Sequence, residues 1–224
     1  VQGDWPSDLL LQSLCQQTKE FFPLSTVFVY GKQIKVLMPA AGMSALEHAK
    51  RKALTNSLKK ENLAAGVSRP FERVGDLAAF NLQSEKALEL GLTFRPGQPL
   101  NFYDDLSVFH VLELCGAQTD IMALCHSAIY ILGEYDRLHE SNLLETMEVY
   151  LRCHMSIPEA ANQLSIHRNT MGYRINRINE LVEIDLNDSE TVFHLLLSFH
   201  VLEFYSATVA RDQEEQRKRK PKRP

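Results

Sequence analysis

The chain has 224 residues, of which 45% are hydrophobic and 23% charged, a composition typical of a soluble globular protein and too apolar for a disordered one. This length has room for one large or two modest domains. The formal net charge of −4 argues against a protein coated in positive potential. The longest apolar runs, such as Ala128–Leu132, are far shorter than the ~20 residues that cross a bilayer, so we expect a cytoplasmic protein with no membrane contact.

The cysteines favour a reducing compartment, because none forms a CxxC pair and all lie in helical apolar patterns: Cys15, Cys115, Cys125 and Cys153. Two disulfides are the less favoured alternative. Histidine follows two of these cysteines directly, but neighbours on a helix point about 100° apart, which is poor geometry for one metal ion. We therefore expect no metal site and no cofactor.

The first part of the chain mixes helical and strand patterns and predicts an α+β domain over residues 1–105. A hairpin is expected around Gly31, between two β-rich runs. The predicted helix that ends at Leu90 is closed by Gly91 as its first residue beyond the helix. In chain order the expected elements are helix Leu9–Phe22, strands Thr26–Tyr30 and Gln33–Met38, helix Met43–Lys60, strand Ala65–Arg69, helix Val74–Leu90 and strand Asn101–Tyr103.

From residue 106 onward no strand is predicted, so the second part is expected to be all-α. The helical candidates are Leu106–Leu114, Thr119–Leu132, Asn142–Cys153, Ile157–Leu164, Arg168–Val182 and Glu190–Val209. We expect a helical connector over 106–140, a second domain over 141–210, and a disordered basic tail over 211–224. The six basic residues between Arg217 and Arg223 would contact phosphate, or form only a solvated terminus.

Residues 156–182 have the pattern of a helix-turn-helix. Ser156 and Glu159 form a capping box with Pro158 in the first turn, and small residues Ala160 and Ala161 follow where two helices would cross closely. A three-residue turn then leads into a second helix. One stripe of that helix is apolar and is expected to be buried: Met171, Ile175, Ile178 and Val182.

The opposite face of this second helix carries hydrogen-bonding groups and no acid. Between His167 and Arg177 there are three arginines and neither aspartate nor glutamate. Such a face suits contacts with base edges in a DNA major groove. The alternative is an ordinary solvated helix face. The candidate DNA-binding residues are His167, Arg168, Asn169, Thr170 and Tyr173 for base edges, with Arg174 and Arg177 for phosphates.

The run Ile166–Thr170, with Ala160-Ala161 before it and Tyr173–Ile175 after it, resembles the C-terminal helix-turn-helix of the PucR/CdaR family of bacterial transcription regulators. The resemblance covers residues 142–206, and Ile166–Ile175 is also similar to the Fis-type helix-turn-helix. Two positions depart from the family pattern. Ser165 stands where glycine is common, and Gly172 where a larger, often basic residue is common.

The front domain resembles the degenerate GGDEF-like domain that precedes this helix-turn-helix in CdaR-type members. The hairpin Val27–Met38, the strand Gly66–Arg69 and the helix around Ser84–Leu88 carry the similarity. Active cyclases have acidic residues in the hairpin turn, whereas this chain has Tyr30-Gly31-Lys32-Gln33-Ile34. Both carboxylates that would serve metal and catalysis are missing, so we expect no enzyme. The domain is expected to be truncated at its N-terminus.

The resemblance implies a sequence-specific DNA-binding regulator, an activator of a catabolic operon that responds to a small metabolite. Double-stranded DNA is the expected partner. A homodimer or higher homo-oligomer is expected because one helix-turn-helix covers few base pairs. The effector would bind to an N-terminal region that the chain lacks. Two alternatives stay open: a nucleotide-binding signalling module without catalysis, and a helical domain that docks other proteins.

Overall fold

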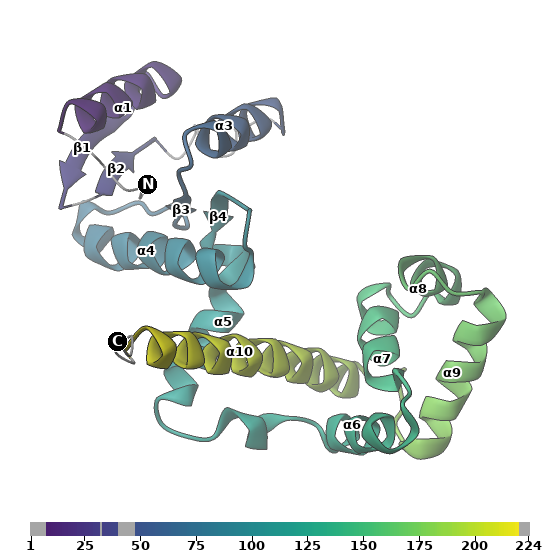
Figure 1. Cartoon of the computed structure of the whole chain (residues 1–224). Coiled ribbons are helices and arrows are strands. Elements are labelled where there is room, and N and C mark those ends of the chain that lie inside the picture. The colour runs from purple at the N-terminus through teal and green to yellow at the C-terminus, as the bar shows by residue number, and fades with distance from the viewer. Residues whose placement is uncertain (1–7, 32, 40–47, 220–224) are drawn as a thin grey trace, which may run out of the picture. The chain divides into compact units, whose positions relative to one another are not determined.

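The computed structural model describes residues 8–31, 33–39 and 48–219 (Figure 1). By internal contacts the chain divides into two compact units, Val1–Val111 and Leu112–Pro224. The division falls within helix α5 (Tyr103–Gly116).

The N-terminal unit combines helices with two small sheets. Its elements before α5 are α1 (Asp8–Phe21), β1 (Thr26–Tyr30), β2 (Gln33–Leu37), α3 (His48–Lys60), β3 (Ala65–Val67), the 3₁₀ turn η1 (Val74–Asp76), α4 (Leu77–Phe94) and β4 (Leu100–Phe102). The predicted order of helices and strands is confirmed over the described residues. Residues 43–47 of the predicted helix before β3 lie outside them.

The strands of this unit pair two by two. β1 and β2 form the predicted antiparallel hairpin, with Gly31 at a φ of +59° in its turn, and β3 runs parallel to β4. α1 and α3 lie on one side of the strands and α4 on the other (Figure 1). One apolar cluster is centred on Leu14 and Ile34, and another on Leu58 and Leu100, so the helices bury the inner faces of both pairs.

The prediction that Gly91 ends a helix is wrong. Helix α4 continues through Gly91 to Phe94, and its C-cap is Arg95. Gly91 is buried, and a Cβ atom placed on it would lie 2.1 Å from Cγ of Asn101, itself fully buried. The glycine is needed for this close packing of α4 against β4, which no local pattern reveals.

The C-terminal unit is helical, and the described residues after β4 contain no strand. Its elements are the 3₁₀ turn η2 (Ile121–Leu124), α6 (Ser127–His139), α7 (Leu143–Arg152), α8 (Ile157–Gln163), α9 (Arg168–Leu181) and α10 (Ser189–Arg219). The predicted change from α+β to all-α is therefore confirmed for the described part of the chain.

The expected single helix Thr119–Leu132 is in fact broken. Its first part is the turn η2, and His126 is extended (φ −61°, ψ 141°) before α6 begins. The backbone N–H of His126 donates to Oγ of the buried Ser198 at 2.8 Å, and its ring Nδ1 accepts from the N–H of Ala128 at 3.1 Å. Contacts with α10 thus override the local helical pattern.

The prediction of a disordered tail from residue 211 is wrong for its first part. Helix α10 runs to Arg219 rather than ending near Val209. Residues 210–219 contain neither proline nor glycine and are mostly good helix formers, so nothing local stops the helix. Residues 220–224 lie outside the described part.

Part of α10, Ser189–Arg211, is the one segment among the described residues that is long and apolar enough to span a membrane. The helix contacts η2, α6 and α7. Its residues Leu195, Phe199, Val201 and Phe204 are buried. One face of α10 is therefore part of the core of the C-terminal unit.

Candidate nucleic-acid interface

Helices α8 and α9 form the predicted helix-turn-helix. Ala160 and Ala161 are buried where α8 packs on α9. The turn closes through the N–H of Ile166, which donates to the carbonyl of Ala161 at 3.0 Å. Ser165 adopts a left-handed conformation (φ +54°), which favours glycine, the residue expected at this turn position from the family resemblance.

The capping box at the start of α8 is only partly confirmed. Ser156 is the N-cap residue and a proline occupies the first turn. The side chain of Ser156 makes no cap hydrogen bond, and the two residues before it, His154 and Met155, are left-handed.

Helix α9 is amphipathic as predicted. Met171, Ile175 and Ile178 are buried, and so is Val182 just beyond the helix. The N-cap is His167, whose ring Nδ1 accepts a hydrogen bond from the N–H of Asn169 at 3.2 Å. With Nδ1 accepting this bond, Nε2 is the ring nitrogen that can donate to the surroundings.

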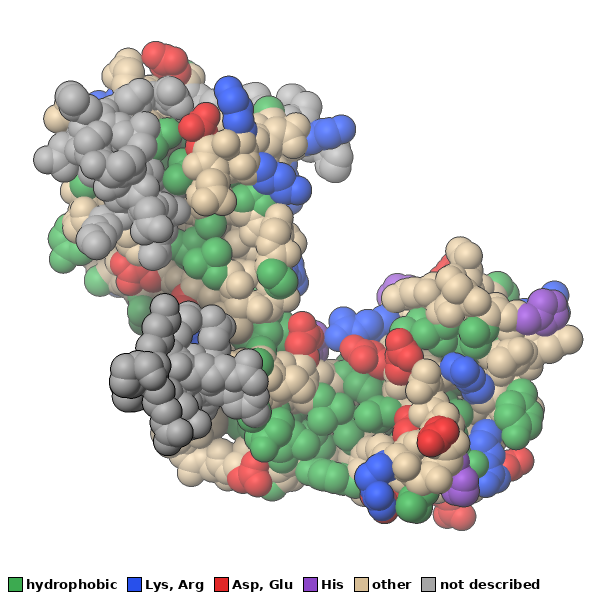
Figure 2. Space-filling view, in the orientation of Figure 1, with side chains coloured by type: hydrophobic (Ala, Val, Ile, Leu, Met, Phe, Trp, Pro, Cys, Tyr) green, Lys and Arg blue, Asp and Glu red, His purple; other side chains and the backbone are tan. Residues whose placement is uncertain are grey.

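The N-terminal half of α9 presents an exposed polar face. Tyr173 is 70% exposed. Figure 2 shows histidine and basic side chains gathered at the outer end of α8 and α9. The exposed group comprises His167, Arg168, Asn169, Thr170 and Tyr173. The structure therefore brings together the five residues assigned to base edges, with no carboxylate among them.

Arg174 and Arg177 belong to a different group. Nη1 of Arg174 donates to Oγ1 of the buried Thr146 on α7 at 3.1 Å. Nε of Arg177 donates to the hydroxyl of Tyr135 on α6 at 3.2 Å, and its Nη1 donates to Glu180 at 2.7 Å. Both arginines are half-buried along the side of α9 that faces α6 and α7.

Arg177 also lies over the ring of Tyr135, with 5.1 Å between Cζ and the ring centroid. The hydrogen bond to Glu180, and after it the bond to Tyr135, raises the pKa of this guanidinium. Sequence reasoning missed Tyr135 because it lies 42 residues before Arg177, in a helix that carries no recognisable motif.

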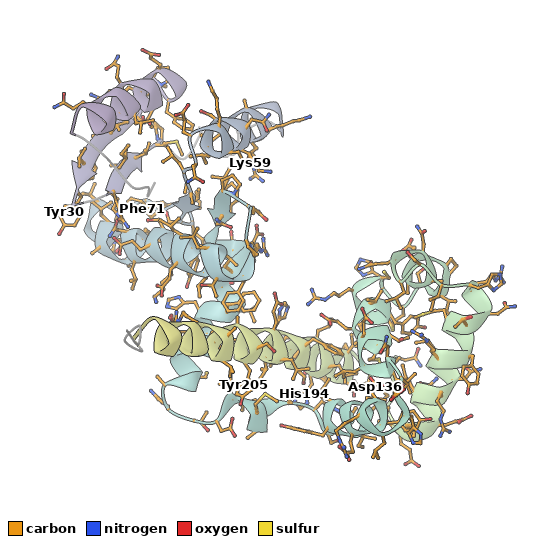
Figure 3. The ribbon with its side chains drawn as sticks, in the orientation of Figure 1. Tyr30, Lys59, Phe71, Asp136, His194 and Tyr205 are labelled. Carbon is orange, nitrogen blue, oxygen red and sulfur yellow. The ribbon has the colours of Figure 1, made fainter. Side chains whose placement is uncertain are left out.

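A second residue of α6 that the sequence did not single out holds the start of α7. The carboxylate of Asp136 accepts from the N–H groups of Leu143 at 2.7 Å and Leu144 at 2.8 Å, and from Oγ of Ser141 at 2.5 Å (Figure 3). A carboxylate on the first N–H groups of a helix satisfies donors that have no partner inside the helix. Asp136 therefore joins α6 to the helix that precedes the helix-turn-helix.

The N-terminal unit contains a cavity of about 420 Å³ lined by β2, β3 and α4 among others. Most of its lining is apolar. Nζ of Lys35 lies 2.7 Å from Oε1 of Glu85 in its wall, and this hydrogen bond holds the pKa of Glu85 below its ordinary value. The described residues contain no cluster of three metal-ligating side chains.

The geometry of α7 to α9, with a buried stripe and an exposed acid-free face on the second helix, is that of a helix-turn-helix, a motif common in DNA-binding proteins. Residues 143–201 match the family model described as the PucR C-terminal helix-turn-helix domain. The C-terminal unit of the chain therefore contains a segment similar to the helix-turn-helix of PucR-type proteins.

The chain is also similar to three proteins from Bacillus subtilis (strain 168). The chain is 29% identical over 142 residues to the Purine catabolism regulatory protein, covering 63% of this chain and 26% of that protein. It is 30% identical over 95 residues to the DNA-binding transcriptional activator AdeR (42% and 22%). It is 32% identical over 100 residues to the Proline-responsive transcriptional activator PutR (45% and 24%). The aligned part thus spans about a quarter of each relative.

Proposed function

We propose that this chain is the DNA-binding part of a transcription regulator and recognises a specific double-stranded sequence through α9. The observation that carries the proposal is the exposed, acid-free face of His167, Arg168, Asn169, Thr170 and Tyr173. Arginine and asparagine have the donor and acceptor geometry that distinguishes guanine and adenine in the major groove.

In this proposal the N-terminal half of α9 enters the major groove, and N–H groups at helix starts contact phosphates. Arg174 and Arg177 flank the exposed face, and their assignment to phosphates stays a prediction. One module covers few base pairs, which supports binding as a homodimer to two half-sites.

The names of the relatives support a more specific role for the regulator. Two of them carry the name transcriptional activator, one is named proline-responsive, and one is named for purine catabolism. These names support an activator of a catabolic operon that responds to a small metabolite. Because the aligned part spans about a quarter of the relatives, we place effector binding outside this chain.

For the N-terminal unit we infer a degenerate GGDEF-like domain without enzymatic activity. The support is the β1–β2 hairpin, in which Gly31 takes the left-handed turn conformation while Tyr30 and Gln33 flank it. No carboxylate stands at this turn, so nothing there would hold the metal ions that phosphoryl chemistry requires.

Selection of bound sequences from random duplexes, followed by binding isotherms at two salt concentrations, tests the proposal. We expect one enriched motif, bound about 10³-fold more tightly than a scrambled duplex of the same length. Affinity should fall steeply with salt, because phosphate contacts release counterions. No enriched motif together with no salt-dependent binding would favour the alternative of a protein-docking helical domain.

A further inference from the structure

Which side chains of α9 face the DNA depends on the rotation of the helix about its own axis. Successive residues on a helix are about 100° apart, so a modest rotation replaces one groove-facing side chain by its neighbour. A recognition helix therefore needs contacts that set its rotation as well as its depth of burial.

The buried stripe of α9 sets this rotation only coarsely. Met171, Ile175 and Ile178 are held by apolar contacts. The hydrophobic effect is roughly proportional to buried area and has no preferred direction. Hydrogen bonds, in contrast, weaken steeply when their angle departs from a narrow range.

Directional contacts lie on the side of α9 that faces α6 and α7. Arg177 donates to the hydroxyl of Tyr135 and stacks over its ring, and Arg174 donates to Thr146. The two arginines are three residues apart, so both project from the same side of the helix. Two directional bonds one turn apart resist rotation of α9 in either sense.

The partner Tyr135 is itself held firmly. Its ring packs at 4.2 Å between centroids on the ring of His139, one turn further along α6. The neighbouring residue Asp136 binds the first N–H groups of α7. One turn of α6 thus fixes both α7 and α9.

From these contacts, and resting on the proposed DNA-binding function, we infer that Tyr135 is a positioning residue that sets the rotation of the recognition helix through Arg177. In this role Arg177 is a structural link, in place of the phosphate contact that the sequence predicts for it. Its guanidinium is engaged on two sides already, by Tyr135 and by Glu180 at 2.7 Å.

The test uses the whole chain and the duplex selected with the unaltered protein, next to a scrambled duplex. Tyr135→Phe removes one oxygen and keeps the ring, while Arg177→Gln removes the charge. Each variant should lose about 3- to 10-fold of its preference for the selected duplex, the scale of one intramolecular hydrogen bond. Affinity for the scrambled duplex and the slope of log K against log salt should stay unchanged.

Arg137→Gln is the matched control, because Arg137 lies on the same helix and its hydrogen bonds within the described part of the chain go to Glu134. Arg137→Gln should leave unchanged the preference for the selected duplex, the affinity for the scrambled duplex and the slope of log K against log salt. Repeating the selection with Tyr135→Phe should also yield a broader base preference, an effect that a lower melting temperature alone does not produce.

Two results overturn the inference. One is that Tyr135→Phe prefers the selected duplex over the scrambled duplex as strongly as the unaltered protein does. The other is an equal loss on both duplexes by Arg177→Gln with a salt slope lower by about one, which would mark Arg177 as a phosphate contact. If Arg177→Gln does not fold, Tyr135→Phe decides alone. A wild-type chain that selects no sequence overturns the proposed function itself.

Discussion

His167 and Arg168 lie side by side at the start of α9 but have different tasks there. The ring of His167 accepts from the N–H of Asn169 and so caps the helix. Arg168 is exposed and makes no hydrogen bond or ion pair with the described residues, so its guanidinium is available to a ligand. The first turn of α9 therefore combines a fixed backbone with a long, unconstrained donor.

Replacing Arg168 by alanine should weaken recognition more than it weakens binding as such. A guanidinium at the start of the helix reaches O6 and N7 of guanine with two parallel bonds, a contact worth ~1–3 kcal/mol of discrimination. Binding isotherms on the selected and scrambled duplexes measure this difference. An equal loss on both duplexes would show that Arg168 contacts phosphate and that the base-contacting face is assigned wrongly.

At the level of single elements, α9 contains a residue in its interior that lowers the stability of the helix. Gly172 lies in the middle of the helix, and a Cβ atom placed on it would meet nothing within 4 Å. Glycine in a helix interior costs about 0.5–1 kcal/mol relative to alanine because it loses more backbone entropy.

Gly172→Ala should therefore raise the free energy of unfolding by about 0.5–1 kcal/mol. Thermal or urea unfolding of the two proteins measures the change. Gly116 lies at the end of α5, where a Cβ would approach Ile121 at 3.5 Å, so Gly116→Ala is a comparison in a more crowded site. A less stable Gly172→Ala would mean that the helix interior is strained in a way the local geometry does not reveal.

The junction between η2 and α6 should make stability depend on pH. Burial, and after it the neighbouring His194, lowers the pKa of His126. The unfolded chain therefore binds more protons at this residue than the folded chain does when the pH falls below about 6.5. The stability that the neutral ring contributes is present above that pH and is lost as the pH falls through the lower folded value.

His126→Asn keeps a side chain that caps helices well but does not titrate. Its melting temperature should fall less between about pH 7.5 and about pH 5.5 than that of the unaltered protein. Thermal unfolding monitored by circular dichroism at both pH values gives the comparison. Identical pH dependence in the two proteins would show that His126 does not couple protons to folding.

For the whole molecule, the expected absence of cyclase chemistry is open to a direct assay. The purified chain should not turn over GTP above a buffer blank with magnesium or manganese. The hairpin turn between β1 and β2 supplies no carboxylate for the metal ions. Formation of a cyclic dinucleotide would contradict this and would reopen the signalling alternative.

Local patterns in the amino-acid sequence are enough to define most of the elements and the exposed face of α9. Helical periodicity places Met171, Ile175 and Ile178 inside, and turn residues mark the β1–β2 hairpin, because both signals are local. The acid-free face from His167 to Tyr173 is equally evident from the order of residues, because its members lie within seven consecutive positions.

The roles of the flanking and junction residues depend instead on tertiary contacts. The sequence predicts a helix end at Gly91, but this glycine makes room for Asn101. His126 interrupts a predicted helix because Ser198 accepts a hydrogen bond from its N–H. The sequence alone predicts that Arg177 is one more exposed basic residue of α9, yet it lies over the ring of Tyr135. These partners are 10 to 72 residues away in the chain, and a pattern over one or two helical turns carries no information about contacts at that separation.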